Sequence, residues 1–196
     1  MNKLDKFRLS LYIKLHNYLY QKISKLAIIL NDDIHPKHRI MKYHQYFLDK
    51  IEKNSNILDI GCSIGLISYK IAEKANKVVA IDIDKNAIEI AKKRYNRNNI
   101  IYINYDATRH NFENVFDYLI LSNVLEHIKN RNRFLKKNKK LSKYLLIRVP
   151  MINRGWLPLF KKELGFEYRL DQTHYIEYTL DTFKKEMKDA RKNYFL

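Results

Sequence analysis

Two glycines and two carboxylates interrupt the apolar runs between residues 56 and 82, in a chain that has only 4 glycines in all. Asp59 lies near the end of one apolar run, Gly61 and Gly65 follow it, and Asp82 ends the next apolar run. Glycine lets the backbone turn tightly and approach a ligand, and a helix that starts there offers free N–H groups. A carboxylate about 20 residues past such a turn accepts both hydroxyls of a ribose. The spacing therefore indicates a site for a ligand that contains a nucleoside.

The glycine pattern excludes one class of nucleoside ligand. A dinucleotide site has three glycines in the order G-x-G-x-x-G, whereas the corresponding positions here are Gly61, Ser63 and Leu66. This departure argues against NAD and FAD. Asp84 has a different predicted role from Asp82, because an aspartate just before a helix caps its first turn.

Two histidines are candidates for proton transfer, because the unperturbed pKa of histidine suits neutral pH. His127 follows Glu126 in the sequence LEHI, and His174 lies in the sequence DQTHYIEYT. Each has a structural alternative, in which His127 caps or packs its helix and His174 holds a loop. Asn123, Glu126 and His127 have the spacing i, i+3 and i+4, which predicts that they share one face of a helix.

Apolar strands that alternate with helical patterns must position these residues. The predicted strands are residues 54–60, 77–82, 100–105, 116–122 and 144–150, and the predicted helices are residues 64–73, 85–95, 124–141 and 178–190. This alternation predicts a doubly wound, mainly parallel α/β sheet with helices on both faces. Ligands bind such a sheet beyond the carboxyl ends of its strands, where the winding reverses. The glycine turn and Asp82 lie at that edge.

The length of 196 residues and the 46% hydrophobic content fit one globular domain with an extension. We expect an amphipathic helical extension over residues 1–35 and the α/β domain over residues 36–196, with residues 150–177 as a lid over the site. The chain shows no membrane-spanning run and no signal-peptide layout, and a lone Cys62 suits a reducing compartment. We therefore expect a cytoplasmic protein, with peripheral membrane attachment as the alternative.

The charge balance is strongly basic, with 38 Lys and Arg against 21 Asp and Glu and a net charge of +17. Such an excess favours nucleic acid, an anionic membrane surface or an acidic substrate as a partner. The alternative is compositional, because AT-rich codons supply the Lys, Asn, Ile and Tyr in which this chain is rich. Since the basic residues are spread over nearly every segment, the charge alone identifies no partner.

The sequence of the N-terminal part predicts two helices. Residues 5–30 form a basic amphipathic helix whose apolar stripe is Tyr12, Leu15, Leu19, Ile23, Leu26 and Leu30. We expect this stripe to pack against its own domain or against a partner such as a second copy of the chain, and attachment to a membrane surface is the alternative. Pro36 begins a second helix, whose apolar face is Ile40, His44, Phe47, Leu48 and Ile51.

Four stretches together resemble the successive motifs of class I S-adenosylmethionine-dependent methyltransferases, in particular the small-molecule, type 11-like branch: ILDIGCSIG, VVAIDID, INYDA and FDYLILSNVLEHI. The resemblance implies a Rossmann-like methyltransferase sheet and S-adenosylmethionine as the cofactor. By position it implies the following cofactor-binding residues: Asp59, Gly61, Cys62, Ser63 and Gly65 around the methionine end, Asp82 at the ribose, Ile83, Asp106 and Ala107 around the adenine, and Ser122 and Asn123 at the reactive centre.

The chain departs from the family pattern at two places. Ser63 stands where the family usually has glycine, and only RKNYFL follows the last predicted helix, where the family commonly adds an antiparallel hairpin. We therefore expect an abbreviated C-terminal end with at most one short strand. An edge strand left bare invites unwanted pairing, so we expect the N-terminal helix or a dimer partner to cover it.

The resemblance implies transfer of a methyl group from S-adenosylmethionine to a small-molecule or lipid- or glycan-linked acceptor, and we expect that acceptor to be a hydroxyl. The upstream stretch HPKHRIMKYHQYFLDKI resembles a helix found in relatives that act on lipids, sugars or surface glycans. RNA is an alternative acceptor, favoured by the charge alone. A scaffold subunit that binds the cofactor without catalysis is a further alternative, favoured by the short C-terminus.

The stretch from Asn123 to His127 also resembles the metal-binding E-x-x-E-H of small-RNA 2′-O-methyltransferases, in which a further histidine completes a magnesium site. Asn123 replaces the first glutamate here, which leaves one carboxylate where a hard cation prefers several oxygens. We therefore expect no metal. Instead, His127 or His174 acts as the base, and the rate falls as the pH drops below about 6–7.

Overall fold

A computed structural model describes residues 2–32, 34–109, 112, 115–190 and 194–195. The chain divides into two units, Met1–Tyr46 and Phe47–Leu196, which are described separately below. Among the described residues, no helix combines the length and the apolar character that crossing a membrane requires.

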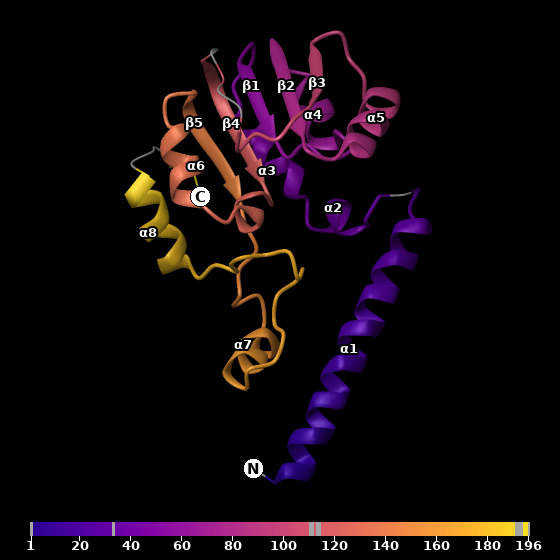
Figure 1. Ribbon diagram of the computed structural model, residues 1–196. Helices are drawn as coiled ribbons and strands as arrows, with labels where there is room; N and C mark the ends of the chain where they lie inside the picture. The colour runs from indigo at the N-terminus through magenta and orange to yellow at the C-terminus, as the bar shows by residue number, and fades with distance from the viewer. Residues whose placement is uncertain (1, 33, 110–111, 113–114, 191–193, 196) are drawn as a thin grey trace. The chain divides into compact units, whose positions relative to one another are not determined.

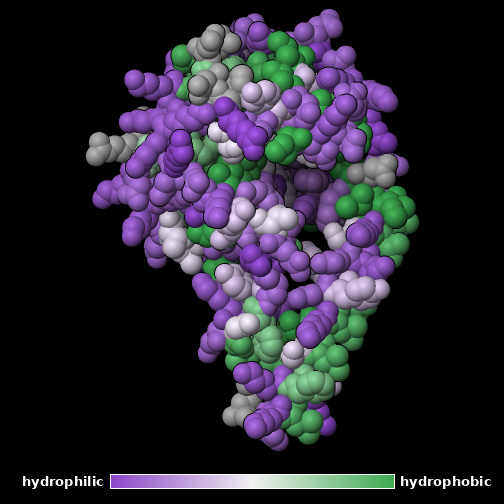
Figure 2. Space-filling view, viewed as in Figure 1, coloured by the Kyte–Doolittle hydropathy of each residue, from purple (hydrophilic) through white to green (hydrophobic). Residues whose placement is uncertain are grey.

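The N-terminal unit is helical. Helix α1 is Lys3–Ile29, and every residue of its predicted apolar stripe is exposed, by 47–86%. Figure 2 shows hydrophobic residues at the surface along α1. The expectation that this stripe packs against its own domain or a partner stays a prediction.

The prediction of a single helix after Pro36 is wrong. Two helices, α2 (Lys37–Ile40) and α3 (Tyr43–Lys50), take its place. Lys42 between them has φ of 49°, in the left-handed region that an α-helix of L-residues cannot continue through. The break separates the predicted apolar face, because Ile40 is 65% exposed whereas Phe47 is fully buried.

A six-stranded sheet organises the second unit, with the order β3-β2-β1-β4-β5-β6. Its strands are β1 (Asn56–Ile60), β2 (Lys77–Asp82), β3 (Ile100–Asn104), β4 (Phe116–Ser122), β5 (Ser142–Arg148) and β6 (Tyr194–Phe195), and all neighbours pair in parallel. The winding reverses between β1 and β4, as in a doubly wound sheet. The predicted fold class is therefore confirmed.

The C-terminal end of the sheet is short. β6 adds two residues in parallel beside β5, with Leu145 opposite Tyr194 and Leu146 opposite Phe195. The rest of the predicted C-terminal segment, residues 191–193 and 196, lies outside the described residues.

Helices cover the two faces of the sheet (Figure 1). Right-handed crossovers place α4 (Leu66–Ile71) and α5 (Lys85–Arg94) on one face, and α6 (Arg131–Lys137) and α8 (Leu180–Ala190) on the other. α5 packs against β2 and β3, whereas α6 packs against α8. Because side chains alternate along a strand, Leu58, Leu119 and Leu145 join the core under α6 and α8.

The helix predicted over residues 124–141 is interrupted. A 3-10 turn, η1 (Leu125–His127), follows β4, the backbone is extended at Ile128, and α6 begins only at Arg131. Leu125 is fully buried and fixes the turn to the core. The prediction that Asn123, Glu126 and His127 share a helix face is therefore wrong, since Asn123 precedes the turn and has φ of 58°.

Residues 150–177 leave the sheet after β5 and contain helix α7 (Trp156–Glu163). Figure 1 shows α7 and its flanking loops beyond the carboxyl ends of β4 and β5. The segment is tied to itself by Glu177, which is buried and pairs with Arg154 while accepting a hydrogen bond from the Leu170 backbone N–H. That this segment is a lid over an acceptor stays a prediction.

Candidate functional site

The glycine turn after β1 is shaped by packing against the loop after β4. Gly61 has φ of +76°, and a Cβ built on it would overlap with Cγ2 of Val124. Only glycine therefore fits between the two loops at the point where the winding reverses. The turn is held to β2 by hydrogen bonds from the N–H groups of Gly61 and Cys62 to the carbonyl of Ile81.

Gly65 serves the close packing of α4. It is the N-cap residue of α4 with φ of +83°, and a Cβ there would stand 2.6 Å from the hydroxyl of Tyr102 and 2.9 Å from Cβ of Ala91. The helix thus begins close against β3 and α5.

Asp82 holds the turn as well as marking the end of β2. Its Oδ2 accepts a hydrogen bond from the Ser63 N–H at 2.7 Å, and its Oδ1 accepts one from the Asp84 N–H at 2.8 Å. Ser63 adopts φ of 50°, so it follows the left-handed path that the family's glycine allows. Asp84 caps α5 by accepting from Asn86 N–H and Ala87 N–H, as predicted.

Asp59 lies beneath the turn and is only 1% exposed. Its Oδ2 accepts a hydrogen bond of 2.6 Å from Oγ of Ser68. Burial raises the pKa of Asp59 to about 6, partly offset by the bond from Ser68 and increased by Asp82. Burial also raises the pKa of the Cys62 thiol far above its usual range, so this thiol stays neutral.

Three predicted adenine-side residues follow β2 and β3. Ile83 is 70% exposed directly after Asp82, and Ala107 is buried. Asp106 accepts hydrogen bonds at Oδ1 from the N–H and the hydroxyl of Thr108, and these bonds lower its pKa. The carboxyl ends of β2 and β3 therefore bring an exposed apolar side chain and a charged carboxylate to one edge.

The loop after β4 carries the predicted reactive-centre residues. Ser122 ends β4 and pairs in register with Arg148 of β5. The Asn123 N–H donates to the Arg148 carbonyl at 2.8 Å, and the Asn123 side-chain Oδ1 accepts from Arg148 Nε at 3.1 Å. Arg148 thus fixes the backbone of Asn123 and engages its side-chain oxygen.

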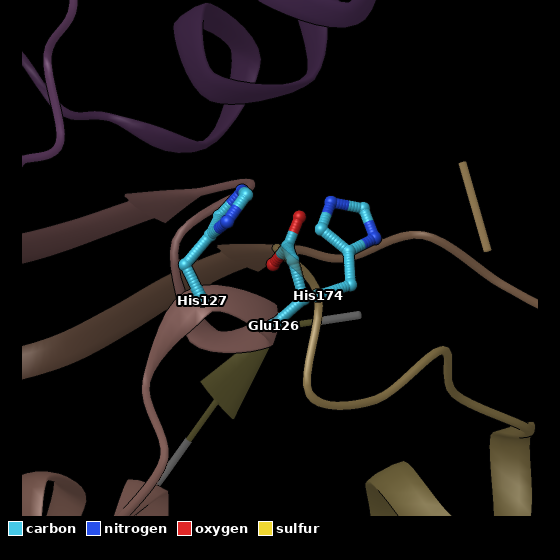
Figure 3. A group of neighbouring side chains, drawn as sticks. All are labelled: Glu126, His127 and His174. Atoms are coloured by element: carbon cyan, nitrogen blue, oxygen red, sulfur yellow. The ribbon is translucent and has the colours of Figure 1, made fainter. Parts of the chain in front are cut away.

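Glu126 and His127 of η1 meet His174 from the loop before α8. One ligand atom of each residue lies within 4.8 Å of the others, and Figure 3 shows the Glu126 carboxylate between the two imidazole rings. The rings of His127 and His174 are 4.6 Å apart between centroids and nearly perpendicular. The Tyr175 N–H donates to the Glu126 carbonyl at 2.7 Å, which joins the two segments. The structure therefore brings the two predicted histidines together in one cluster.

Burial sets the electrostatics of this cluster. Glu126 is fully buried, and burial raises the pKa of its carboxyl to about 7, while the charge of Arg148 partly offsets the rise. Partial desolvation of the His127 ring and, to a smaller extent, the charge of His174 lower the pKa of His127. Neither oxygen of Glu126 has a hydrogen-bond partner among the described residues.

Residues that the sequence did not single out support the two histidines. Oγ1 of Thr173 lies 2.9 Å from Nδ1 of His127 and donates to Oδ1 of Asp171 at 2.8 Å. Oε1 of Glu177 lies 3.5 Å from Nδ1 of His174. No spacing in the sequence indicates these contacts, because they depend on how an irregular segment returns to the sheet.

Comparison with known proteins accounts for this architecture. Residues 58–143 match the family described as "Methyltransferase domain". The chain belongs to the class I S-adenosylmethionine-dependent methyltransferases. Its match with the ubiquinone biosynthesis O-methyltransferase of Rickettsia prowazekii is 32% identical over 145 residues, 69% of this chain and 54% of the relative.

Two further methyltransferases show the breadth of the family. The ribosomal protein L11 methyltransferase of Thermotoga maritima is 33% identical over 106 residues, 52% of this chain and 38% of the relative. The structure of the N-methyltransferase NodS from Bradyrhizobium japonicum WM9, in complex with S-adenosyl-L-homocysteine, has a TM-score of 0.58 at 18% identity, covering 76% of this chain and 73% of that one. The chain spans about half the length of the Rickettsia relative, and the two relatives found by sequence are named for different acceptors.

Proposed function

We propose that this methyltransferase transfers the methyl group of S-adenosylmethionine to a hydroxyl of a small-molecule or lipid- or glycan-linked acceptor. The observation that supports a hydroxyl is the cluster of Glu126, His127 and His174 at the carboxyl end of β4. A neutral hydroxyl is a poor nucleophile and must lose its proton during the displacement, so it needs such groups beside it. The relative from Rickettsia prowazekii is itself named an O-methyltransferase.

The cofactor is expected at the carboxyl ends of β1, β2 and β4. The turn after β1 suits the methionine end, Asp82 suits the ribose, and Ile83 with Asp106 suits the adenine. Methyl transfer from a sulfonium is an in-line displacement, so alignment of the acceptor and exclusion of water supply much of the rate. Residues 150–177 are the segment we propose for that exclusion.

RNA is the second proposed acceptor, supported by the net charge of +17. Binding to RNA through phosphates would weaken steeply as salt is raised. A scaffold subunit that binds the cofactor without catalysis is the third possibility.

Transfer of a labelled methyl group separates these proposals. The purified chain is incubated with S-adenosylmethionine labelled in the methyl group, together with catechols and other phenols, lipid extract, glycan extract or RNA. Label in a methyl ether of a phenol, lipid or glycan supports the proposal, and label in RNA alone supports the RNA proposal. Binding of the cofactor without transfer to any fraction would support the scaffold.

A further inference from the structure

We infer that Glu126, His127 and His174 form a site for a divalent transition-metal ion such as Zn²⁺, at which the acceptor hydroxyl binds. The inference that an ion binds here rests on the geometry alone. Its role with the acceptor rests on the proposed function.

The three side chains have the donors and the proximity that such an ion requires. Their ligand atoms lie within 4.8 Å of one another. Around a tetrahedral Zn²⁺ with bonds of about 2.1 Å, ligand atoms stand about 3.4 Å apart. Small side-chain rotations therefore bring the three atoms to bonding distance.

The buried carboxyl of Glu126 supplies the second, independent observation. Glu126 is 0% exposed and His174 is 6% exposed. Among the described residues, neither oxygen of Glu126 has a hydrogen-bond partner. Buried polar groups are nearly always satisfied, and an unpartnered buried carboxylate is costly. A cation between the side chains removes that cost.

An oxygen atom lies beside Nδ1 of each imidazole, in the arrangement known for metal-binding histidines. The hydroxyl proton of Thr173 is donated to Asp171, so Oγ1 of Thr173 accepts its other hydrogen bond from Nδ1–H of His127. This leaves the Nε2 lone pair of His127 for an ion. Oε1 of Glu177 stands 3.5 Å from Nδ1 of His174. Metal-bound histidines characteristically direct their second nitrogen to such a group, which fixes the tautomer and raises the basicity of the ligand.

The donor set differs from a magnesium site and explains why the sequence pattern predicts no metal. Two imidazole nitrogens and one carboxylate suit Zn²⁺ and other first-row divalent ions, whereas Mg²⁺ prefers oxygen ligands. Asn123, at the place of a possible second carboxylate, has its Oδ1 engaged by Arg148. Three protein ligands, one of them the exposed His127, leave a coordination position open on the solvent side.

The chemistry at that position balances without a further reactant. An acceptor hydroxyl bound to the ion loses its proton more readily and becomes the nucleophile. Its oxygen forms a bond to the methyl carbon as the bond from that carbon to sulfur breaks. S-adenosylhomocysteine and the methyl ether leave, and the hydroxyl proton passes to water.

Metal binding is tested on the full chain, made without a polyhistidine tag and stripped with a chelator. Zn²⁺ is titrated by calorimetry, and Co²⁺ is titrated by visible absorption, which reports its coordination. We expect one equivalent to bind and the melting temperature to rise. Glu126→Gln and His174→Gln should weaken binding by at least about 100-fold, and Thr173→Val by about 10–100-fold. His16→Gln on α1 is the matched control and should bind as the unaltered chain does.

Two results would overturn the inference. One is the absence of saturable binding by the unaltered chain. The other is equal binding by the folded Glu126→Gln and His174→Gln variants, and the exposed His127→Gln gives the same test if a buried variant fails to fold. Calorimetry with S-adenosylhomocysteine keeps the two proposals apart. A chain that binds this nucleoside but no metal contradicts the metal site alone, and the converse contradicts the proposed function.

Discussion

We expect the proposed cofactor site to depend most on Asp82. Replacing it by alanine removes the carboxylate expected at the ribose and the bonds to the N–H groups of Ser63 and Asp84. Hydrogen bonds to a charged group are worth about 1.5–3 kcal/mol, so we expect Asp82→Ala to weaken S-adenosylhomocysteine binding by about 10–100-fold. Isothermal titration calorimetry measures this directly.

Asp84→Ala is the matched control for that experiment. It removes the cap of α5, so we expect a stability loss of about 1 kcal/mol with nearly unchanged affinity. Unchanged affinity in a folded Asp82→Ala variant would remove Asp82 from the site.

Asp59 should make the stability depend on pH. Its pKa in the folded protein is about 6, raised by burial above the ordinary value of 3.8, so folding favours its protonated form. The stability that the protonated carboxyl of Asp59 contributes is therefore fully present below about pH 4 and is lost as the pH rises through 6. Between pH 4 and pH 7, the free energy of unfolding of the unaltered chain should fall by about 3 kcal/mol relative to that of Asp59→Asn.

Urea unfolding of the two proteins at pH 4, 5, 6 and 7 measures the difference in the free energy of unfolding. The amide oxygen of the substituted side chain would still accept the bond from Ser68, so packing changes little. A difference that stays constant with pH would show that Asp59 is not shifted as described.

The roles of some single residues could be predicted from local chemistry, whereas the contacts between distant segments that form the site could not. Asp84 as the cap of a helix and Gly61 as a tight turn follow from their neighbours in the chain. The meeting of Glu126 with His174 does not, because it depends on the path of residues 150–177, which have no clear periodicity. The exclusion of any side chain at Gly61 by Val124 likewise joins two separate loops.

At the scale of elements, the packing of α4 against β3 is expected to tolerate no side chain at Gly65. Gly65→Ala places a Cβ at φ of +83° and 2.6 Å from the Tyr102 hydroxyl. Backbone strain and overpacking each cost about 1–3 kcal/mol, so we expect a loss of about 2–6 kcal/mol. Thermal and chemical unfolding measure it.

Tyr102→Phe tests the cause of that loss. Removing the hydroxyl relieves the closest contact, although it also removes the hydrogen bond to the Tyr95 carbonyl. The double variant should therefore be destabilised by less than the sum of the two single changes. If the stability losses of the two single variants simply add in the double variant, the contact between residue 65 and the Tyr102 hydroxyl is not the cause of the loss.

Strongly patterned elements could be predicted from the sequence almost to the residue. The ranges 77–82 and 116–122 coincide with β2 and β4, because both are apolar runs with clear boundaries. The predicted helix over 124–141 fails where the chain turns extended at Ile128, since helical spacing cannot distinguish a 3-10 turn plus a short helix from one long helix. The break after Ile40 escaped prediction for the same reason.

At the scale of the whole molecule, α1 is expected to bind anionic membranes. The apolar stripe, with Lys14, Lys22 and Lys25 on the same helix, is typical of an amphipathic helix that lies on a membrane surface, which is the alternative to packing against its own domain or a partner. Each lysine near an anionic surface contributes about 1 kcal/mol. We expect the full chain to sediment with vesicles rich in phosphatidylglycerol and less so at high salt.

A charge-reversed variant, with glutamate at positions 14, 22 and 25, is the control for this experiment. It should lose vesicle binding while its melting temperature changes little. Equal binding by the variant, or dimerisation of the full chain without vesicles, would contradict the membrane proposal and favour a second copy of the chain as the partner.

We propose that the carboxyl ends of β1, β2 and β4 hold the cofactor with its reactive end toward Glu126, His127 and His174. A crystal structure of the chain with S-adenosylhomocysteine bound tests it most directly. We predict the ribose hydroxyls on Asp82 and the sulfur directed at the cluster, within the reach of one acceptor atom. A nucleoside bound elsewhere, or a sulfur that faces away from the two histidines, would rule out this position of the cofactor.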